Sequence, residues 1–274
     1  MTGQVVVVST TVDPASANIA EKLLGSIPWD EQDGYLSSGC YRLIILEEKL
    51  IYLRDLDHRL KDLGLDPDLV VFASRHQSKN KAPRLCGHFT GNSKEALMGG
   101  NSHELAAAAP GSLKSFLSNL AREAPCDFLI SAEATHHGPS DMKTPSFFAE
   151  IGSTEREWSD PAAGMAVARS ILEMKPHLGP VFLGFGGGHY VQRQSRIILE
   201  TGIAFGHLFS NYQMDDVDLK LVEEAQLKSG ASYAYLDKKS LRSKAKRNML
   251  DILDRLGLET INERDIGDRF PRPG

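Results

Sequence analysis

The stretch VVVVSTTVDPASANI, residues 5–19, carries the signals that decide the fold. Its run of four valines predicts a strand buried on both faces, because continuous β-branched apolar residues suit the interior of a parallel sheet. Asp13 can then cap a helix that has Pro14 at its first position, and Ile19 follows at helical spacing. A buried strand that leads directly into a helix is the repeating unit of an α/β fold.

The rest of the chain repeats this alternation. The pattern predicts further strands at residues 69–73, 127–131, 146–151, 181–184, 202–207 and 231–235, and a hairpin formed by 41–46 and 50–53. It predicts helices at residues 113–120, 161–174, 190–199, 217–227 and 244–256. We therefore expect a three-layer α/β/α fold with a mixed, largely parallel sheet, in a single domain of residues 1–274 whose tail, 268–274, is flexible.

Composition narrows the class of protein. The 274 residues are 41% hydrophobic and 24% charged, which is typical of a globular chain. The three cysteines are widely spaced, the chain has no long apolar run, and its start lacks the features of a signal peptide. These features predict a cytoplasmic protein without a membrane segment. The net charge of −5 argues against a DNA-binding protein, so any RNA binding must come from local basic patches.

Most of the nine histidines fall just after predicted strands. In an open α/β sheet the ligand site lies beyond the carboxyl ends of the strands. Histidine is the commonest metal ligand and the usual acid or base near neutral pH. We therefore expect a polar site there, built from His76, His88, Glu133, His136, His137, His189 and His207. The alternative for Glu133–His137 is a hydrogen-bonded loop with surface histidines.

The segment GFGGGH, residues 184–189, places a glycine turn between a strand and a helix. This layout suits an anion or the close approach of a substrate backbone. It lacks the third glycine of the dinucleotide fingerprint, where His189 stands, and the Lys-Ser/Thr ending of a phosphate-binding loop. A tight turn capped by His189 is the alternative.

Two segments are locally basic. Residues 74–88 read as a polar loop whose cations could hold phosphate oxygens, or as a merely solvated loop; Cys86 in it could be a ligand or simply buried. Residues 238–247 contain six basic residues and suit an RNA backbone, or form a solvated helix start.

HExxH, GxSxG and paired CxxC motifs are all absent from the sequence. The residues alone thus predict an α/β protein with a histidine-rich polar cleft.

Taken together and in order, the segments VDPASANI, SRH, CGHFTGN, EATHHGP, GGGHY and AFGHLFSNY extend this prediction. They resemble the archaeal and plant type of D-aminoacyl-tRNA deacylase over nearly the whole chain. The resemblance implies hydrolysis of the ester between a D-amino acid and the tRNA 3′ end, a zinc cofactor, and a fold similar to the phosphorylase/peptidyl-tRNA-hydrolase type.

On this basis each candidate residue receives an expected role. The metal ligands would be His88, His136 and His189. The catalytic residues would be Glu133, His137 and His76. The substrate-binding residues would be Arg75, Lys79, Lys81, Arg84, Gly186, Gly187, Gly188 and Arg193. The glycine-loop amides would face the oxyanion or the terminal adenosine.

Two other classes of function remain open. One is a small-molecule hydrolase or phosphorylase on a similar fold, which would not need the basic segments. The other is a non-catalytic RNA- or metal-binding protein. For the favoured function we expect a monomer, with the acceptor end of D-aminoacyl-tRNA as its partner.

Overall fold

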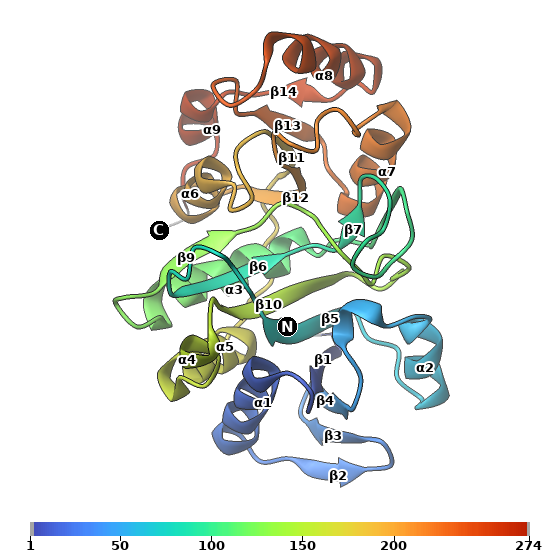
Figure 1. Ribbon diagram of the computed structural model, residues 1–274, viewed down its shortest axis with the longest axis vertical. Coiled ribbons are helices and arrows are strands. Elements are labelled where there is room, and N and C mark those ends of the chain that lie inside the picture. The colour runs from blue at the N-terminus through green and yellow to red at the C-terminus, as the bar shows by residue number, and fades with distance from the viewer. Residues whose placement is uncertain (1–2, 273–274) are drawn as a thin grey trace.

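The computed structural model describes residues 3–272, which form two sheets with helices on both faces (Figure 1). Within these residues the larger sheet has eight strands, in the order β2 (Asp30–Gln32), β3 (Tyr35–Ser38), β4 (Tyr41–Leu46), β1 (Val5–Thr10), β5 (Leu69–Arg75), β10 (Ser146–Gly152), β6 (Arg84–His88) and β9 (Leu129–Ala132). Strand β1 pairs in parallel with β4 and β5, and β5 with β10, whereas β6 is antiparallel to β10. The predicted mixed, largely parallel sheet is confirmed.

The smaller sheet is parallel throughout, in the order β12 (Ala204–Phe209), β11 (Val181–Phe185), β13 (Tyr233–Leu236) and β14 (Glu259–Thr260). Two backbone hydrogen bonds join it to the larger sheet just after β9. The N–H of Thr135 donates to the carbonyl of Leu208 at 2.7 Å, and that of Ala134 to the carbonyl of His189 at 2.8 Å. The histidine-rich segment that follows β9 therefore lies at the seam between the two sheets.

Helices cover each sheet on both faces, which gives the predicted three layers. On the larger sheet, α1 (Pro14–Ser26), α3 (Pro110–Glu123), α4 (Glu155–Trp158) and α5 (Pro161–Leu172) cover one face, and η1 (Leu50–Tyr52) with α2 (Leu56–Asp62) the other. On the smaller sheet, α6 (Gln192–Glu200) and α9 (Glu263–Arg269) lie opposite α7 (Leu219–Ser229) and α8 (Ser243–Arg255). A two-stranded ribbon, β7 (Gly91–Asn92) and β8 (Glu104–Leu105), completes the described strands.

The opening segment folds as its sequence predicts. Val5 and Val7 belong to the core beneath α1 and α5, whereas Val6 and Val8 belong to the core beneath α2, because side chains alternate between the faces of a strand. Oδ1 of Asp13 accepts the N–H groups of Ala15 and Ser16 at 2.9 and 3.2 Å and so caps α1.

Two local predictions are wrong. Residues 50–52 form a 3₁₀ turn and no hairpin strand, because the side chains of Leu50 and Leu53 are buried under the sheet face. Residues 84–88, expected as a polar loop, form the fully buried strand β6. Its polar residues alternate with Leu85 and Gly87, which face α3, so the polar side lines a site and not solvent.

The predicted tail begins inside α9, and its described part is packed against the protein. The ring of Phe270 contacts those of Phe182 and Tyr233, and Pro271 forms a β-bridge with Thr201. Residues 273–274 of the tail lie outside the described residues. Within the described chain, no helix combines the length and apolar character needed to cross a membrane.

Candidate active site

The predicted site residues meet over a face of the larger sheet, where the strand direction reverses. His76 directly follows β5 and Glu133 directly follows β9, yet these strands run in opposite directions because β10 and β6 are antiparallel. The register places Glu150 of β10 opposite Cys86 of β6. His76 thus lies at the carboxyl end of β5, as expected, and Glu150 lies near that of the parallel strand β10. His88 and Glu133 reach the same place from β6 and β9, which run the opposite way.

His76 lies between two buried glutamates. Its Nδ1 is 3.1 Å from Oε1 of Glu133 and 3.7 Å from Oε2 of Glu150, and both glutamates are at most 2% exposed. Its Nε2 lies 3.0 Å from the hydroxyl of Tyr190. Burial lowers the pKa of His76, but the nearby carboxylates of Glu150 and Glu133 outweigh it and raise that pKa. Because both ring nitrogens are held, His76 is built to orient Glu133.

Three histidines form a second group above Glu150. The candidate ligand atoms of His88, His136 and His137 lie within 4.8 Å of one another. In each ring, Nδ1 faces a backbone carbonyl: that of Phe89 at 3.0 Å, Ala134 at 2.8 Å and Gly138 at 2.7 Å, respectively. A histidine that donates Nδ1–H to a carbonyl keeps the Nε2 lone pair free, which is the arrangement of metal-bound histidines.

A third group shares a histidine with the second. Candidate ligand atoms of Glu133, His136 and His189 also lie within 4.8 Å of one another. Oε2 of Glu133 is 2.8 Å from Nε2 of His189 and 3.8 Å from Nε2 of His136. The predicted ligands are thus divided between two groups: His88 belongs to the second, His189 to the third, and His136 to both. His137, predicted as catalytic, lies with His88 and His136 in the second group.

The buried atoms of these groups fit zinc, whose ligands are imidazole nitrogen and carboxylate oxygen. Among the described residues, Nε2 of His88 is buried without a hydrogen-bond partner, and the buried carboxylate of Glu133 meets only imidazole nitrogens. Such atoms are costly unless something binds them. Burial and the charge of His88 lower the pKa of His137 to about 4, and burial also lowers that of His136. Both are therefore neutral at pH 7, as metal ligands must be.

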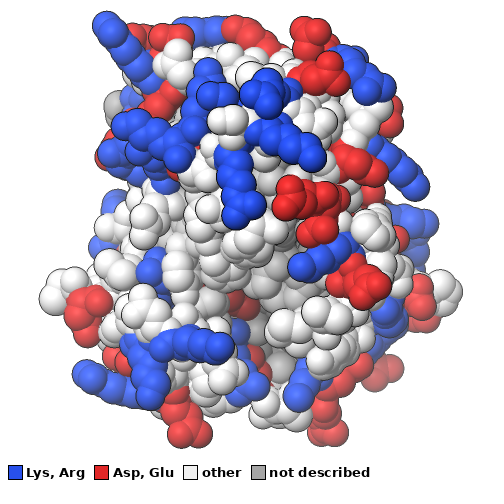
Figure 2. Space-filling model, turned by 45° about the horizontal axis from the view of Figure 1, so that its top comes forward, with Lys and Arg blue, Asp and Glu red and all other residues white. Residues whose placement is uncertain are grey.

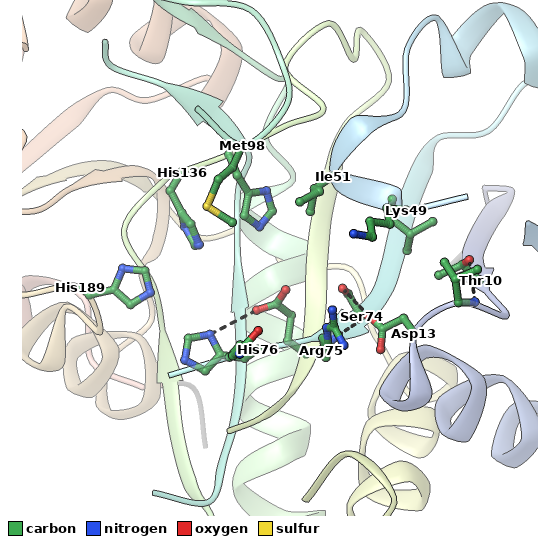
Figure 3. Close-up of a pocket in the computed structure, with 15 residues that line it drawn as sticks. Thr10, Asp13, Lys49, Ile51, Ser74, Arg75, His76, Met98, His136 and His189 are labelled. Atoms are coloured by element: carbon green, nitrogen blue, oxygen red, sulfur yellow. Dashed lines mark hydrogen bonds and ion pairs between the residues drawn. The ribbon is translucent and has the colours of Figure 1, made fainter. Parts of the chain in front are cut away.

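A cavity of about 320 Å³ opens above these groups (Figure 3). His76, His136 and His189 lie at one end and Asp13 at the other, together with Thr10 and Lys49, while Ile51 and Met98 supply apolar surface between them. Asp13 is already saturated at that end, because it caps α1 with one oxygen and accepts the N–H of Arg75 at 2.9 Å with the other. The cavity therefore joins an apolar wall to a polar, histidine-lined end.

The predicted phosphate-binding cations have different surroundings. Arg75 lines the cavity, with its guanidinium 5.0 Å from the ring centre of Trp158, and Lys79 and Lys81 are exposed on the following loop. Arg84 is buried, donates to the hydroxyl of Ser131 at 2.9 Å and lies 3.8 Å from the ring centre of Tyr190. Arg84 therefore fixes Tyr190 and does not face solvent.

Arg193 and the glycine loop are also engaged by the protein. Arg193 lies 3.4 Å from Asp237 and 3.5 Å from Glu263. The N–H of Gly186 donates to the carbonyl of Phe209, and that of Gly187 to the hydroxyl of Ser240, both at 2.7 Å. These two amides do not face an oxyanion, so the loop serves instead to place His189 beside Glu133. The helix begins only at Gln192, after Val191, and His189 does not cap it.

His207, which the sequence groups with the other histidines, belongs to the seam between the sheets. It is fully buried, with Nε2 3.0 Å from the carbonyl of Ala106 and Nδ1 3.0 Å from the hydroxyl of Thr135. Both nitrogens are satisfied by the protein, so His207 holds the sheets together and does not reach the cavity.

The sequence reasoning missed Glu150 and Tyr190. Glu150 is the single charged residue of the strand SFFAEIG, residues 146–152. A carboxylate in an otherwise apolar, buried strand is costly without partners, and this signal could have identified it. Tyr190 gives no such local signal, because its contact with His76 depends on the position of α6.

Comparisons with known proteins give consistent results. A family model described as D-aminoacyl-tRNA deacylase matches residues 63–261. A protein of Methanothrix thermoacetophila named D-aminoacyl-tRNA deacylase is 46% identical over 96% of this chain and 98% of its own. One of the same name from Methanosarcina mazei is 41% identical over 97% of this chain and 95% of its own. A crystal structure described as a conserved protein of unknown function is similar with a TM-score of 0.93 and 32% identity, over 98% of this chain and 99% of that one.

Proposed function

The chain belongs to the D-aminoacyl-tRNA deacylase family, and we propose that it hydrolyses the ester between a D-amino acid and the 3′-terminal adenosine of tRNA in the cavity described above. The observation that carries the location is the buried Glu133, whose two oxygens meet His76 at 3.1 Å and His189 at 2.8 Å, two histidines that line the cavity. The activity makes the protein a hydrolase of translation quality control.

The reaction needs a water positioned against the ester carbonyl. The oxygen of water bonds to the carbonyl carbon, the bond from that carbon to the 3′-oxygen of the ribose breaks, and the leaving oxygen takes up a proton. The contact with His189 and the charge of His76 outweigh burial and lower the pKa of Glu133 to about 2, so its carboxylate is ionised at neutral pH. We assign Glu133 to orient the water and accept its proton, with His76 holding the carboxylate in place.

Zinc is the cofactor that these residues fit. His88, His136 and His137 would hold it through Nε2, and Glu133 with His189 would complete or extend the site. Bound zinc supplies an acidified water and polarises a carbonyl oxygen. The chain itself orients the ligands through the three backbone carbonyls, and the burial of His136 and His137 keeps them neutral.

We further propose that the enzyme works in the cytoplasm as a monomer. Its substrate is part of the translation machinery, and its three cysteines are unpaired thiols, as expected in a reducing compartment. A small-molecule hydrolase on the same fold would use the same cavity but would make no use of the cations around it.

The test compares release of tyrosine from D-Tyr-tRNA and from L-Tyr-tRNA by the purified full-length protein. The proposal expects fast release from the D-isomer and little above the spontaneous rate from the L-isomer. N-acyl amino acids and nucleosides, assayed in parallel, test the alternative. Equal rates for both tRNA isomers, or turnover of the small molecules alone, would overturn the assignment.

A further inference from the structure

Three loops at the carboxyl end of the smaller sheet form one continuous surface beside the cavity. The N–H of Gly187, after β11, donates to the hydroxyl of Ser240, after β13, at 2.7 Å. The N–H of Asn211, after β12, donates to the carbonyl of Gly187 at 2.8 Å. His189 belongs to the first of these loops and lines the cavity. A ligand that leaves the cavity past His189 therefore passes directly over this surface.

An exposed aromatic ring stands where this surface meets the cavity. Tyr212 is 57% exposed, and its hydroxyl lies 3.2 Å from Nδ1 of His189. The contact places the ring beside His189, which lines the cavity, while the side chain remains largely exposed. Exposed aromatic rings of this kind are the platforms on which unpaired nucleic-acid bases stack.

Beyond the ring the surface is positively charged. Residues 238–247, which we name the basic segment, contain Lys238, Lys239, Arg242, Lys244, Lys246 and Arg247. Within the described chain none of these six side chains has an acidic partner within ion-pair distance. Figure 2 shows Lys and Arg side chains crowded over the upper part of the molecule, where the smaller sheet lies.

The acid that immediately precedes the basic segment does not neutralise it. Asp237, which precedes it, is buried and faces Arg193 at 3.4 Å. A chain with a net charge of −5 thus keeps a group of cations free at one place, next to its candidate active site. Unpaired cations can bind the phosphates of a single nucleic-acid strand, and an adjacent aromatic ring can stack on the base at its end.

We propose that the acceptor end of tRNA docks on this surface, with its 3′-terminal adenine stacked on Tyr212 and its phosphates on the basic segment. The inference rests on the proposed function, because it takes aminoacyl-tRNA as the substrate. It adds a route and a direction: the tRNA body lies over β13 and α8, and the aminoacyl group points past His189 toward Glu133. Arg84, which is buried, takes no part in this contact.

The first test removes charge from the basic segment. In Lys244→Gln/Lys246→Gln/Arg247→Gln, affinity for uncharged tRNA, measured by fluorescence anisotropy over a range of salt concentrations, should fall at low salt. The slope of log Kd against log salt should become shallower by about 2 to 3, which corresponds to three lost phosphate contacts. The matched control is Lys61→Gln/Arg122→Gln/Lys175→Gln, which removes three exposed cations from the segments that precede the amino ends of β5, β9 and β11. An identical slope in the two triple variants would overturn the basic segment as the docking surface.

The second test isolates the stacking contact. Wild-type protein should bind complete tRNA about 5- to 150-fold more tightly than tRNA that lacks its terminal adenosine, since one stacked base contributes that much. In Tyr212→Ala this difference should vanish, whereas Tyr212→Phe, which keeps the ring, should retain it. If the difference persists in Tyr212→Ala, the terminal adenine does not stack on Tyr212.

These measurements separate the docking surface from the proposed function. Binding of uncharged tRNA does not require an ester, so it reports on the surface alone, and the D-Tyr-tRNA assay of the wild-type protein reports on the function alone. A wild-type enzyme that releases D-tyrosine while both variants bind tRNA unchanged would refute the surface and leave the function standing. If the variants change tRNA binding as predicted but the wild-type protein releases no D-tyrosine, the docking surface stands and the proposed function is refuted.

Discussion

Oε2 of Glu133 lies 2.8 Å from Nε2 of His189, although Glu133 follows a strand of the larger sheet and His189 a strand of the smaller one. The contact closes the seam between the sheets directly beneath the cavity. It makes the position of the proposed base depend on both halves of the fold.

Glu133→Gln should keep the fold and lose the chemistry. The amide has the shape of the carboxylate but cannot accept a proton, so kcat should fall by about 10²- to 10⁴-fold. Release of D-tyrosine under saturating D-Tyr-tRNA gives kcat. Glu223→Gln, at an exposed position on α7, is the control and should match the wild type. A kcat for Glu133→Gln within about twofold of the wild type would exclude the assigned role.

Substitution of a histidine in the proposed zinc site should reduce the amount of zinc that the protein retains. His88→Asn and His137→Asn should each lower the zinc retained per chain after dialysis, measured by mass spectrometry, because each removes one oriented Nε2. His58→Asn removes a histidine that pairs with Asp62 on the surface and should retain the wild-type amount. Equal zinc in all three variants would contradict the assignment of ligands.

The protein should lose stability in acid partly through His207. Burial lowers the pKa of this histidine to about 3, and the charge of Lys228 acts in the same direction, whereas the hydrogen bond to Ala106 raises it. Nε2 faces the carbonyl of Ala106 and therefore carries the proton of the neutral ring, so Nδ1 accepts from the hydroxyl of Thr135, and a proton on Nδ1 would break that bond.

The sign follows from the depressed pKa. Between pH 6.5 and 3 the unfolded chain binds the proton and the folded chain does not, so the free energy of unfolding should fall by about 1.4 kcal/mol per pH unit as pH decreases. His207→Gln cannot titrate and should lack this part of the slope. Urea unfolding at several pH values from 6.5 to 4.5 measures both slopes, and parallel slopes would show that His207 is not the responsible group.

Two neighbouring glycines should respond differently to the same substitution. Gly186 has a φ of +93°, and a Cβ there would lie 2.5 Å from Oγ of Ser240, so Gly186→Ala should lower the free energy of unfolding by about 1 to 3 kcal/mol. It should also lower kcat/KM, because the loop places His189. Gly188 has no atom within 4 Å of an added Cβ, so Gly188→Ala should leave both quantities near wild type. Thermal unfolding of the two variants measures stability, and the D-Tyr-tRNA assay measures kcat/KM. Equal losses of stability and kcat/KM in both variants would show that the strain is not local to Gly186.

The sequence alone determined the features that depend on neighbours along the chain. The four valines specify a buried strand because side-chain alternation is a local property, and Asp13 specifies a helix start because its carboxylate reaches the first amides directly. The importance of Glu133 and the histidines also follows from their positions after strands, combined with the family resemblance.

Only the tertiary structure decided how those residues are grouped. The antiparallel pairing of β6 with β10 brings Glu150 between His76 and His88, and the seam between the sheets brings His189 to Glu133. These contacts join segments far apart in the chain, so no local pattern encodes them. The same pairing turned residues 84–88 from an expected loop into a buried strand, because polar side chains that line a site resemble solvent-exposed ones in sequence.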